Sequence, residues 1–263
     1  MSSLDAALSY APVALPTSQT PALSPPASPP RPLGPWATIG WTVIGLASAA
    51  ASAILIVIIA MIWNMARGAG GLTEAQLQDV SQIAISAGFL LFLALIMVAC
   101  RYARWRVADY LAVVRPHGRY VRLAVVALVL PLAMVFGLSA TGLTLASDAE
   151  LPKTTLSLAV TLIAVVVIAP LWEELVFRGF VYRGIASSRL GVTGAIVISS
   201  LLWASLHLDR TWIGMAELFC CGLVWGWLRW RTGSTAVTMA VHCVNNSIAG
   251  VALLGIAMGW WSS

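Results

Sequence analysis

Charged residues are scarce in this chain of 263 residues. Lys, Arg, Asp and Glu together make up only 10% of it, whereas 60% of the residues are hydrophobic. Soluble domains carry about 25% charged residues. So few charges cannot cover a water-soluble globule of this size, and the mean hydropathy of +0.90 agrees. We therefore expect lipid to be a large part of the solvent around this protein.

Cysteine pairs and several common hydrolase motifs are missing. The four cysteines form no CxxC pair, which argues against a thiolate zinc site and against a disulfide framework. The chain contains no HExxH and no GxSG, and no Asp lies within its apolar runs. The formal net charge of +5 does not indicate nucleic acid as a partner, because the basic residues lie in short segments between apolar runs.

Long apolar runs dominate the rest of the sequence. A helix that crosses a bilayer needs about 20 apolar residues. We expect an all-α, polytopic transmembrane helix bundle of about seven helices, at 37–63, 82–100, 122–144, 155–178, 191–208, 212–230 and 234–260. Residues 1–35 hold nine of the thirteen prolines and are predicted to be a disordered cytoplasmic tail. Residues 36–263 then form the transmembrane domain.

The loop arginines and lysines predict the orientation. Cytoplasmic loops carry an excess of Lys and Arg. Eleven basic residues fall on one side of the predicted helices and three on the other, the three being Arg67, Lys153 and Arg210. This bias places the N-terminus in the cytoplasm and predicts a multi-pass protein of the cell membrane.

Ionisable residues inside apolar runs are costly and are therefore candidates for function. Glu173 and Glu174 lie near the end of the fourth run, and Arg178 is four residues beyond Glu174, on the same helix face. His207 ends the fifth run, and His242 stands four residues before Asn246 in the seventh, so that both can aim at one spot. A carboxylate, two imidazoles and an amide that converge in a pocket suit acyl hydrolysis.

Structural roles are open for each of these residues. The glutamates could pair with Arg178 and Arg183 near the interface, His207 could be interfacial, and His242 could join helices by hydrogen bonds. Pro170 should free a backbone carbonyl one turn upstream and kink the helix.

Two features of the sixth run receive structural interpretations. Glu217 is expected to pair with Arg210 or to lie at the outer interface. Gly222 and Gly226 form a GxxxG motif, which predicts close helix packing.

Three motifs follow one another on separate apolar runs. They are EExxxR at Glu173–Arg178, an aromatic residue four before a histidine at Trp203 and His207, and HxxxN at His242–Asn246. In this order they resemble the CAAX protease and bacteriocin-processing family, also called the CPBP or Abi group, to which the CAAX prenyl endopeptidases belong. The resemblance covers about residues 155–250 and implies an intramembrane glutamate protease.

The resemblance also implies catalytic roles. Glu173 would activate a water that His207 helps to hold, and His242 with Asn246 would form the oxyanion site. In such enzymes no metal is required. An alternative site with a divalent metal such as zinc would use His207, His242 and a glutamate.

The motifs also imply supporting roles. Glu174 and Arg178 resemble the family's supporting pair. Trp203 stands where the family usually has Phe, which enlarges the aromatic wall of the pocket.

The predicted function is hydrolysis of a peptide bond in a membrane-associated peptide or protein, lipidated substrates included. Two other classes stay open. One is a non-catalytic immunity or scaffold protein of the same family. The other is a proton-coupled transporter that uses Glu173, Glu174 and Glu217.

The predicted helix boundaries conflict with a shared site. They place His242 about 12 Å and His207 about 25 Å from the cytoplasmic surface. One water cannot bridge this gap, so we expect the fifth helix to differ from its predicted bounds, or these helices to be tilted or broken.

Overall fold

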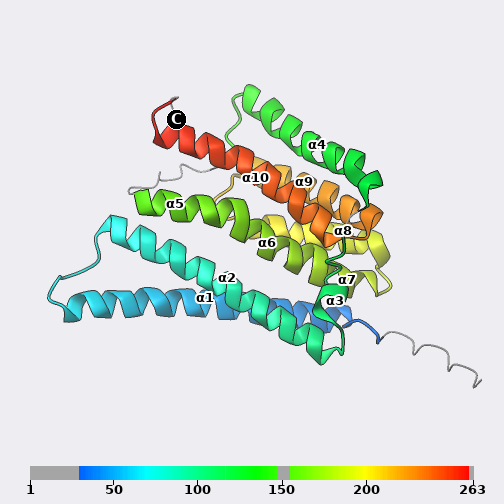
Figure 1. The fold of residues 1–263 in the computed structure, drawn as a ribbon, viewed down its shortest axis with the longest axis horizontal. Helices are drawn as coiled ribbons and strands as arrows, with labels where there is room; N and C mark the ends of the chain where they lie inside the picture. The colour runs from blue at the N-terminus through cyan, green and yellow to red at the C-terminus, as the bar shows by residue number, and fades with distance from the viewer. Residues whose placement is uncertain (1–29, 116, 147–154, 261–263) are drawn as a thin grey trace, which may run out of the picture.

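The computed structural model describes residues 30–115, 117–146 and 155–260. Within these ranges every secondary-structure element is a helix, apart from one isolated bridge between Ala146 and Arg210. The long helices are α1 (Pro35–Ala66), α2 (Glu74–Tyr102), α4 (Val121–Ala140), α8 (Gly191–Ser205), α9 (Trp212–Thr232) and α10 (Thr235–Ala257), together with one continuous helical segment over residues 155–186 (Figure 1). Two short elements, α3 (Val107–Tyr110) and η1 (Gly118–Tyr120), connect α2 to α4. The predicted all-α, polytopic bundle is confirmed.

Five of these helical segments are long and apolar enough to cross a bilayer, namely 35–66, 74–102, 118–140, 155–186 and 235–257. The helix α8 is apolar but has only 15 residues. At 1.5 Å per residue it is about 22 Å long, which is less than the roughly 30 Å of a hydrocarbon core. The helix α9 includes the charged residues Glu217, Arg229 and Arg231.

Several predicted bounds need correction. The second helix begins at Glu74 rather than at 82, because Thr73 and Gln76 form a capping box that satisfies the first free backbone N–H groups. The fifth ends at Ser205 rather than at 208. The disordered tail predicted for residues 1–35 lies largely outside the described residues, which begin at Pro30.

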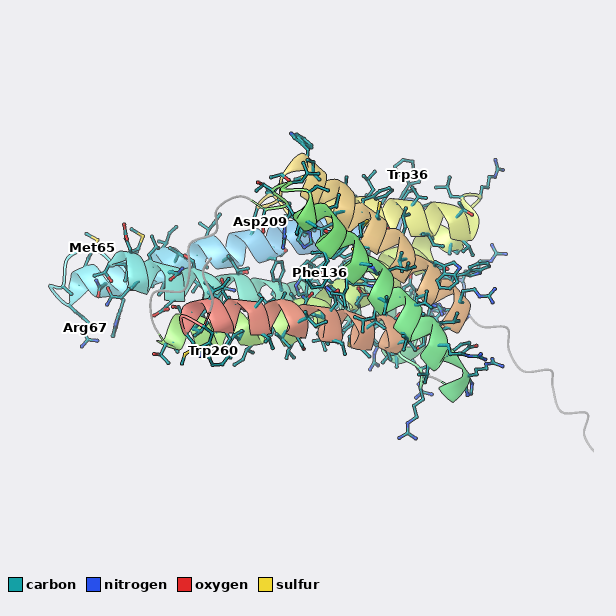
Figure 2. All side chains as sticks on the ribbon, turned by 90° about the horizontal axis from the view of Figure 1, so that it is seen from above. Trp36, Met65, Arg67, Phe136, Asp209 and Trp260 are labelled. Carbon is teal, nitrogen blue, oxygen red and sulfur yellow. The ribbon has the colours of Figure 1, made fainter. Side chains whose placement is uncertain are left out.

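Large apolar side chains cover the outside of the bundle. Figure 2 shows Trp36 and Met65 at opposite ends of α1, and both are more than half exposed. Trp260, which follows α10, is also exposed. Such a surface suits lipid, and the aromatic residues at helix ends suit the bilayer interface. The chain is an integral membrane protein.

One end of the bundle collects the arginine-rich connections. In Figure 1 the start of α1, the α2–α3 connection, the turn between α7 (Tyr182–Ala186) and α8, and the α9–α10 turn all lie at the right. This arrangement agrees with the side on which the eleven basic residues were predicted to lie. Which face of the membrane this end occupies stays a prediction.

Close packing joins α8 to α9. A Cβ atom added at Gly222 would lie 2.7 Å from Cβ of Ser200, and one at Gly226 would lie 3.0 Å from Cγ2 of Ile196. Only glycine permits so close an approach of the two helices. The prediction made from the GxxxG motif is confirmed.

The helical segment over 155–186 changes its winding twice. It runs as α5 (Thr155–Ile163), the π-helical η2 (Ala164–Ile168), α6 (Ala169–Glu173), the π-helical η3 (Glu174–Val181) and α7 (Tyr182–Ala186). π-Helical turns are frequent at functional sites. Here they lie on both sides of Pro170 and Glu173.

Candidate active site

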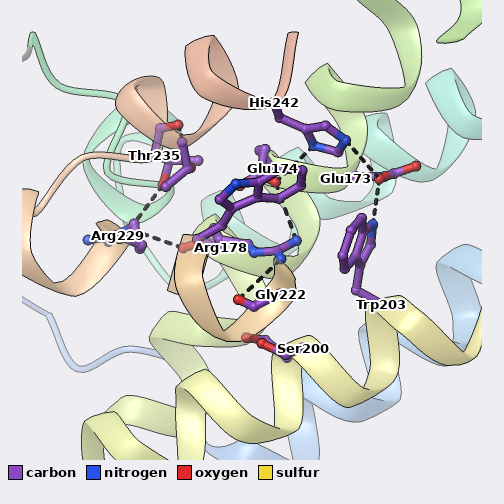
Figure 3. A network of polar contacts seen from close by, with 12 residues as sticks. Glu173, Glu174, Arg178, Ser200, Trp203, Gly222, Arg229, Thr235 and His242 are labelled. Carbon is purple, nitrogen blue, oxygen red and sulfur yellow. Dashed lines mark hydrogen bonds and ion pairs between the residues drawn. The ribbon is translucent and has the colours of Figure 1, made fainter. Parts of the chain in front are cut away.

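Glu173 lies at the junction of α6 and η3, where it meets side chains from two other helices (Figure 3). The indole Nε1 of Trp203, on α8, donates a hydrogen bond of 2.5 Å to Oε2 of Glu173. The same Oε2 lies 3.9 Å from Nε2 of His242, on α10. All three side chains are buried. The other oxygen of Glu173 has no hydrogen bond to any residue that the structure describes, so it is available to a water or a substrate.

Glu174 points in another direction, and one of its oxygens contacts both His242 and Arg178. Its Oε1 lies 3.1 Å from Nδ1 of His242 and 3.3 Å from Nη1 of Arg178, and neither Glu174 nor Arg178 is exposed. A carboxylate only accepts hydrogen bonds, so Nδ1 of His242 carries the proton of this contact. Glu174 therefore fixes the imidazole ring with Nε2 turned toward Glu173.

Arg178 is held between aromatic rings. Its guanidinium lies 4.7 Å from the ring centroid of Trp203 and 5.6 Å from that of Trp225, and Nη2 donates to the backbone oxygen of Gly222 at 3.5 Å. A buried cation needs such partners, because an unpaired charge is costly in a low-dielectric interior. Arg183, by contrast, lies over the rings of Trp105 and Tyr110 rather than beside the glutamates.

Asn246 follows His242 by one turn of α10 and caps a carbonyl that Pro170 leaves free. In the π-helical turn η2, Ala169 donates its N–H to the oxygen of Ala164. The next bond of this kind would run from residue 170 to Val165, but proline has no N–H. Nδ2 of Asn246 donates to the oxygen of Val165 instead, at 2.9 Å. The carbonyl predicted to be free is thus bonded by a side chain of the site.

His207 lies in the turn after α8. Its Nδ1 is 3.0 Å from the backbone oxygen of Trp203, and the two rings meet edge to face at 5.1 Å. In Figure 2 Asp209, two residues further on, lies well short of the end marked by Met65 and Arg67. His207 and His242 both line one cavity, so the predicted separation of the two residues is not found.

One cavity of about 470 Å³ joins these residues. Glu173, His207, His242 and Asn246 all line it, together with Trp203. The structure thus brings the four predicted catalytic residues to one space. Apolar side chains of α4 and α10 complete the wall, namely Leu132, Val135, Phe136, Ile248, Ala249 and Ala252.

Residues 155–248 match the family model described as type II CAAX prenyl endopeptidase, Rce1-like. The resemblance to the CAAX protease family is confirmed. The matched segment holds all four predicted catalytic residues together with Glu174, Arg178 and Trp203, and the family is one of peptidases. Comparisons with curated proteins and with solved structures gave no match.

Two cavity residues lie outside the predicted set. Trp225 packs against the ring of His242, with 4.2 Å between the ring centroids. Glu217 is buried and lines the cavity, and no described ion pair within 4 Å joins it to Arg210. The expected pair with Arg210 is therefore wrong, whereas the position of Glu217 relative to the membrane interface stays a prediction. The sequence did offer a signal for this position, because Glu217 is a lone charged residue inside an apolar run, and such residues are candidates for function.

A three-ligand metal site does not fit this geometry. Within the described ranges no three His, Cys, Asp or Glu side chains come together as a metal-binding group. His207, His242 and a glutamate are thus not gathered as the zinc alternative requires, and we derive no step through a metal.

Proposed function

We propose that this protein is an intramembrane endopeptidase in which Glu173 activates water for attack on a peptide bond. The observation that carries the proposal is that Oε2 of Glu173 and Nε2 of His242 lie 3.9 Å apart at one cavity. Glu174 holds the imidazole in this orientation through Nδ1. Peptidase membership of the matched family supports it.

In the proposed first step, Glu173 takes a proton from a water molecule that His207 helps to hold. The water oxygen forms a bond to the carbonyl carbon, and the carbonyl oxygen becomes an oxyanion. His242, in its protonated form, donates from Nε2 to this oxyanion, and the amide of Asn246 donates its second N–H. Removal of one such donor typically costs about 2.7–4 kcal/mol of barrier.

In the second step, the protonated Glu173 gives its proton to the leaving nitrogen as the C–N bond breaks. The products are a carboxylic acid and an amine, so one water is consumed and no acyl-enzyme forms. Trp203 supports both steps, because its indole N–H orients the carboxylate of Glu173. The apolar wall of the cavity suits a substrate that is itself associated with the membrane.

The test compares membrane peptidomes of cells that express the wild type or Glu173→Gln. We expect fragments that depend on intact Glu173, and their masses distinguish a lipidated C-terminus from an unmodified terminal segment. Glu74→Gln, an exposed glutamate at the start of α2, is the matched control. Identical peptidomes with equal membrane expression would show that the protein acts without turnover, as a scaffold does.

A chelator separates this mechanism from the zinc alternative. Purified protein in proteoliposomes is expected to cleave its identified substrate at the same rate with and without 1,10-phenanthroline. Loss of cleavage with recovery on addition of zinc would overturn the metal-free mechanism.

A further inference from the structure

Glu217 is a buried carboxylate that the proposed mechanism does not use. It lies on α9, only 6% of its surface is exposed, and it lines the same cavity as Glu173 and His242. Its Oε1 accepts a hydrogen bond from the thiol of Cys221 at 2.8 Å. Within the part of the chain that the structure describes, Oε2 has no hydrogen-bond partner.

The protein itself does not neutralise this carboxylate. Arg210 lines the same cavity, but its ion pair is with Asp209, at 3.5 Å between Nε and Oδ2. No ion pair within 4 Å joins Glu217 to a basic residue among those described. A thiol is a weak donor, and a buried charge needs a charged or strongly hydrogen-bonding partner. A cation brought by another molecule would supply it.

The position of Glu217 on α9 sets its distance from the reacting atoms. Glu217, Cys221 and Trp225 follow one another at intervals of four residues, and all three line the cavity. Trp225 is the residue whose ring packs against that of His242, with 4.2 Å between the centroids. Eight residues along a helix span about 12 Å. An extended peptide covers this distance in three to four residues.

We propose that Glu217 forms a subsite for a positively charged group of the substrate, an ammonium or a guanidinium three to four residues from the scissile bond. The apolar wall of α4, with Leu132, Val135 and Phe136, lines the same cavity and suits apolar residues between the two points. This inference rests on the proposed peptidase function and adds a substrate class to it: a peptide with a cation beyond a short apolar stretch.

Binding tests the subsite without turnover. The probes are fluorescent twelve-residue peptides of Leu, Ala and Ser that carry a single Lys, Gln or Glu and an acetylated N-terminus. In detergent-purified Glu173→Gln protein, we expect the Lys peptide to bind at least tenfold more tightly than the Glu peptide. Adding Glu217→Gln should abolish this preference, and Glu217→Lys should reverse it. Adding Glu74→Gln, outside the cavity, should preserve it.

Cleavage by the wild-type protein determines how far the positive charge of the substrate lies from the scissile bond. The same peptides are offered in proteoliposomes with the Lys moved stepwise along the chain, and a further set without Lys carries a free α-amino group. We expect cleavage to peak with the charge three or four residues from the cut. The two sets distinguish a lysine side chain from an N-terminal amine as the bound group.

The outcomes separate the two proposals. Equal affinities of Lys, Gln and Glu peptides, or a preference that survives Glu217→Gln, would overturn the subsite while Glu173-dependent cleavage stands. Cleavage that persists unchanged in Glu173→Gln would overturn the proposed function, whereas the binding preference could still be present. Melting temperatures of the variants show that an altered preference does not come from unfolding.

Discussion

The two adjacent glutamates differ in what surrounds them. Glu174 is enclosed, with Arg178 and His242 on one of its oxygens, whereas Glu173 has the indole of Trp203 and an open side toward the cavity. One carboxylate therefore holds the imidazole in place and the other faces the space where a substrate would lie. Neighbours in sequence thus take different tasks because a helix turns about 100° per residue.

Glutamine at each position should separate these tasks. Glu174→Gln leaves Arg178 as a buried, uncompensated cation, which costs about 3–5 kcal/mol of folding stability. Glu173→Gln still accepts from the indole of Trp203 and should change stability by about 1 kcal/mol or less, while cleavage is lost. Thermal unfolding in detergent, measured beside cleavage, checks both. Equal losses of stability in the two variants would contradict the different roles assigned to Glu173 and Glu174.

Asn246 and its neighbour Asn245 offer a matched pair. Both line the cavity, but Asn246 bonds the free carbonyl of Val165, whereas the only described side-chain bond of Asn245 runs to Asn246, at 3.4 Å. We expect Asn246→Ala to lower the cleavage rate by about 10²–10³-fold, as removal of an oxyanion donor does. Asn245→Ala should have a much smaller effect. Steady-state cleavage rates of the two variants test this prediction. Equal losses of rate would argue against a role of Asn246 in binding the oxyanion.

The helices and the polar residues they carry could be predicted from the sequence, but the winding of the segment over 155–186 could not. Its two π-helical turns depend on partners from other helices. Asn246 bonds the oxygen of Val165, and Arg229 donates from Nε to the oxygen of Arg178 at 3.1 Å. Hydrophobic periodicity carries no information about such partners, because they lie more than 50 residues away.

The same limit explains what was missed in the site. The apolar run over 191–208 indicated a full-length helix, yet α8 stops at Ser205 and places His207 in a turn against Trp203. Trp225 and Glu217 line the cavity because α9 presents one face to it. Only the packing of α9 against its neighbours reveals which face that is.

The contact between α8 and α9 should tolerate no added side chain. Gly222→Ala places a Cβ 2.7 Å from that of Ser200, and overpacking of this kind costs about 1–3 kcal/mol. Ser200→Gly in the same protein should restore part of the loss. Gly137→Ala on α4, where nothing lies within 4 Å, is the control and should not lower stability. Melting temperatures in detergent measure all three, and a neutral Gly222→Ala would contradict the close contact.

At the scale of the whole molecule, the catalytic residues and the arginine-rich connections have different positions. The connections at the arginine-rich end gather together (Figure 1), whereas the cavity is lined by side chains of α4, α6, α8, α9 and α10 and of the α8–α9 connection. The positive-inside rule assigns the arginine-rich end to the cytoplasm. The rule acts on loop charge alone, so this assignment can be tested independently of the chemistry.

Single cysteines report the orientation directly. In a variant without the four native cysteines, Ala69→Cys introduces a thiol into the α1–α2 connection and Ser187→Cys one into the α7–α8 turn, and both positions are exposed and uncharged. A membrane-impermeant maleimide added to intact cells should label residue 69 at once and residue 187 only after permeabilisation. The arginines of each loop stay in place, so the reporter does not change the charge bias that it tests. Labelling of residue 187 in intact cells, with residue 69 protected, would reverse the assigned topology and leave the geometry of the site unaltered.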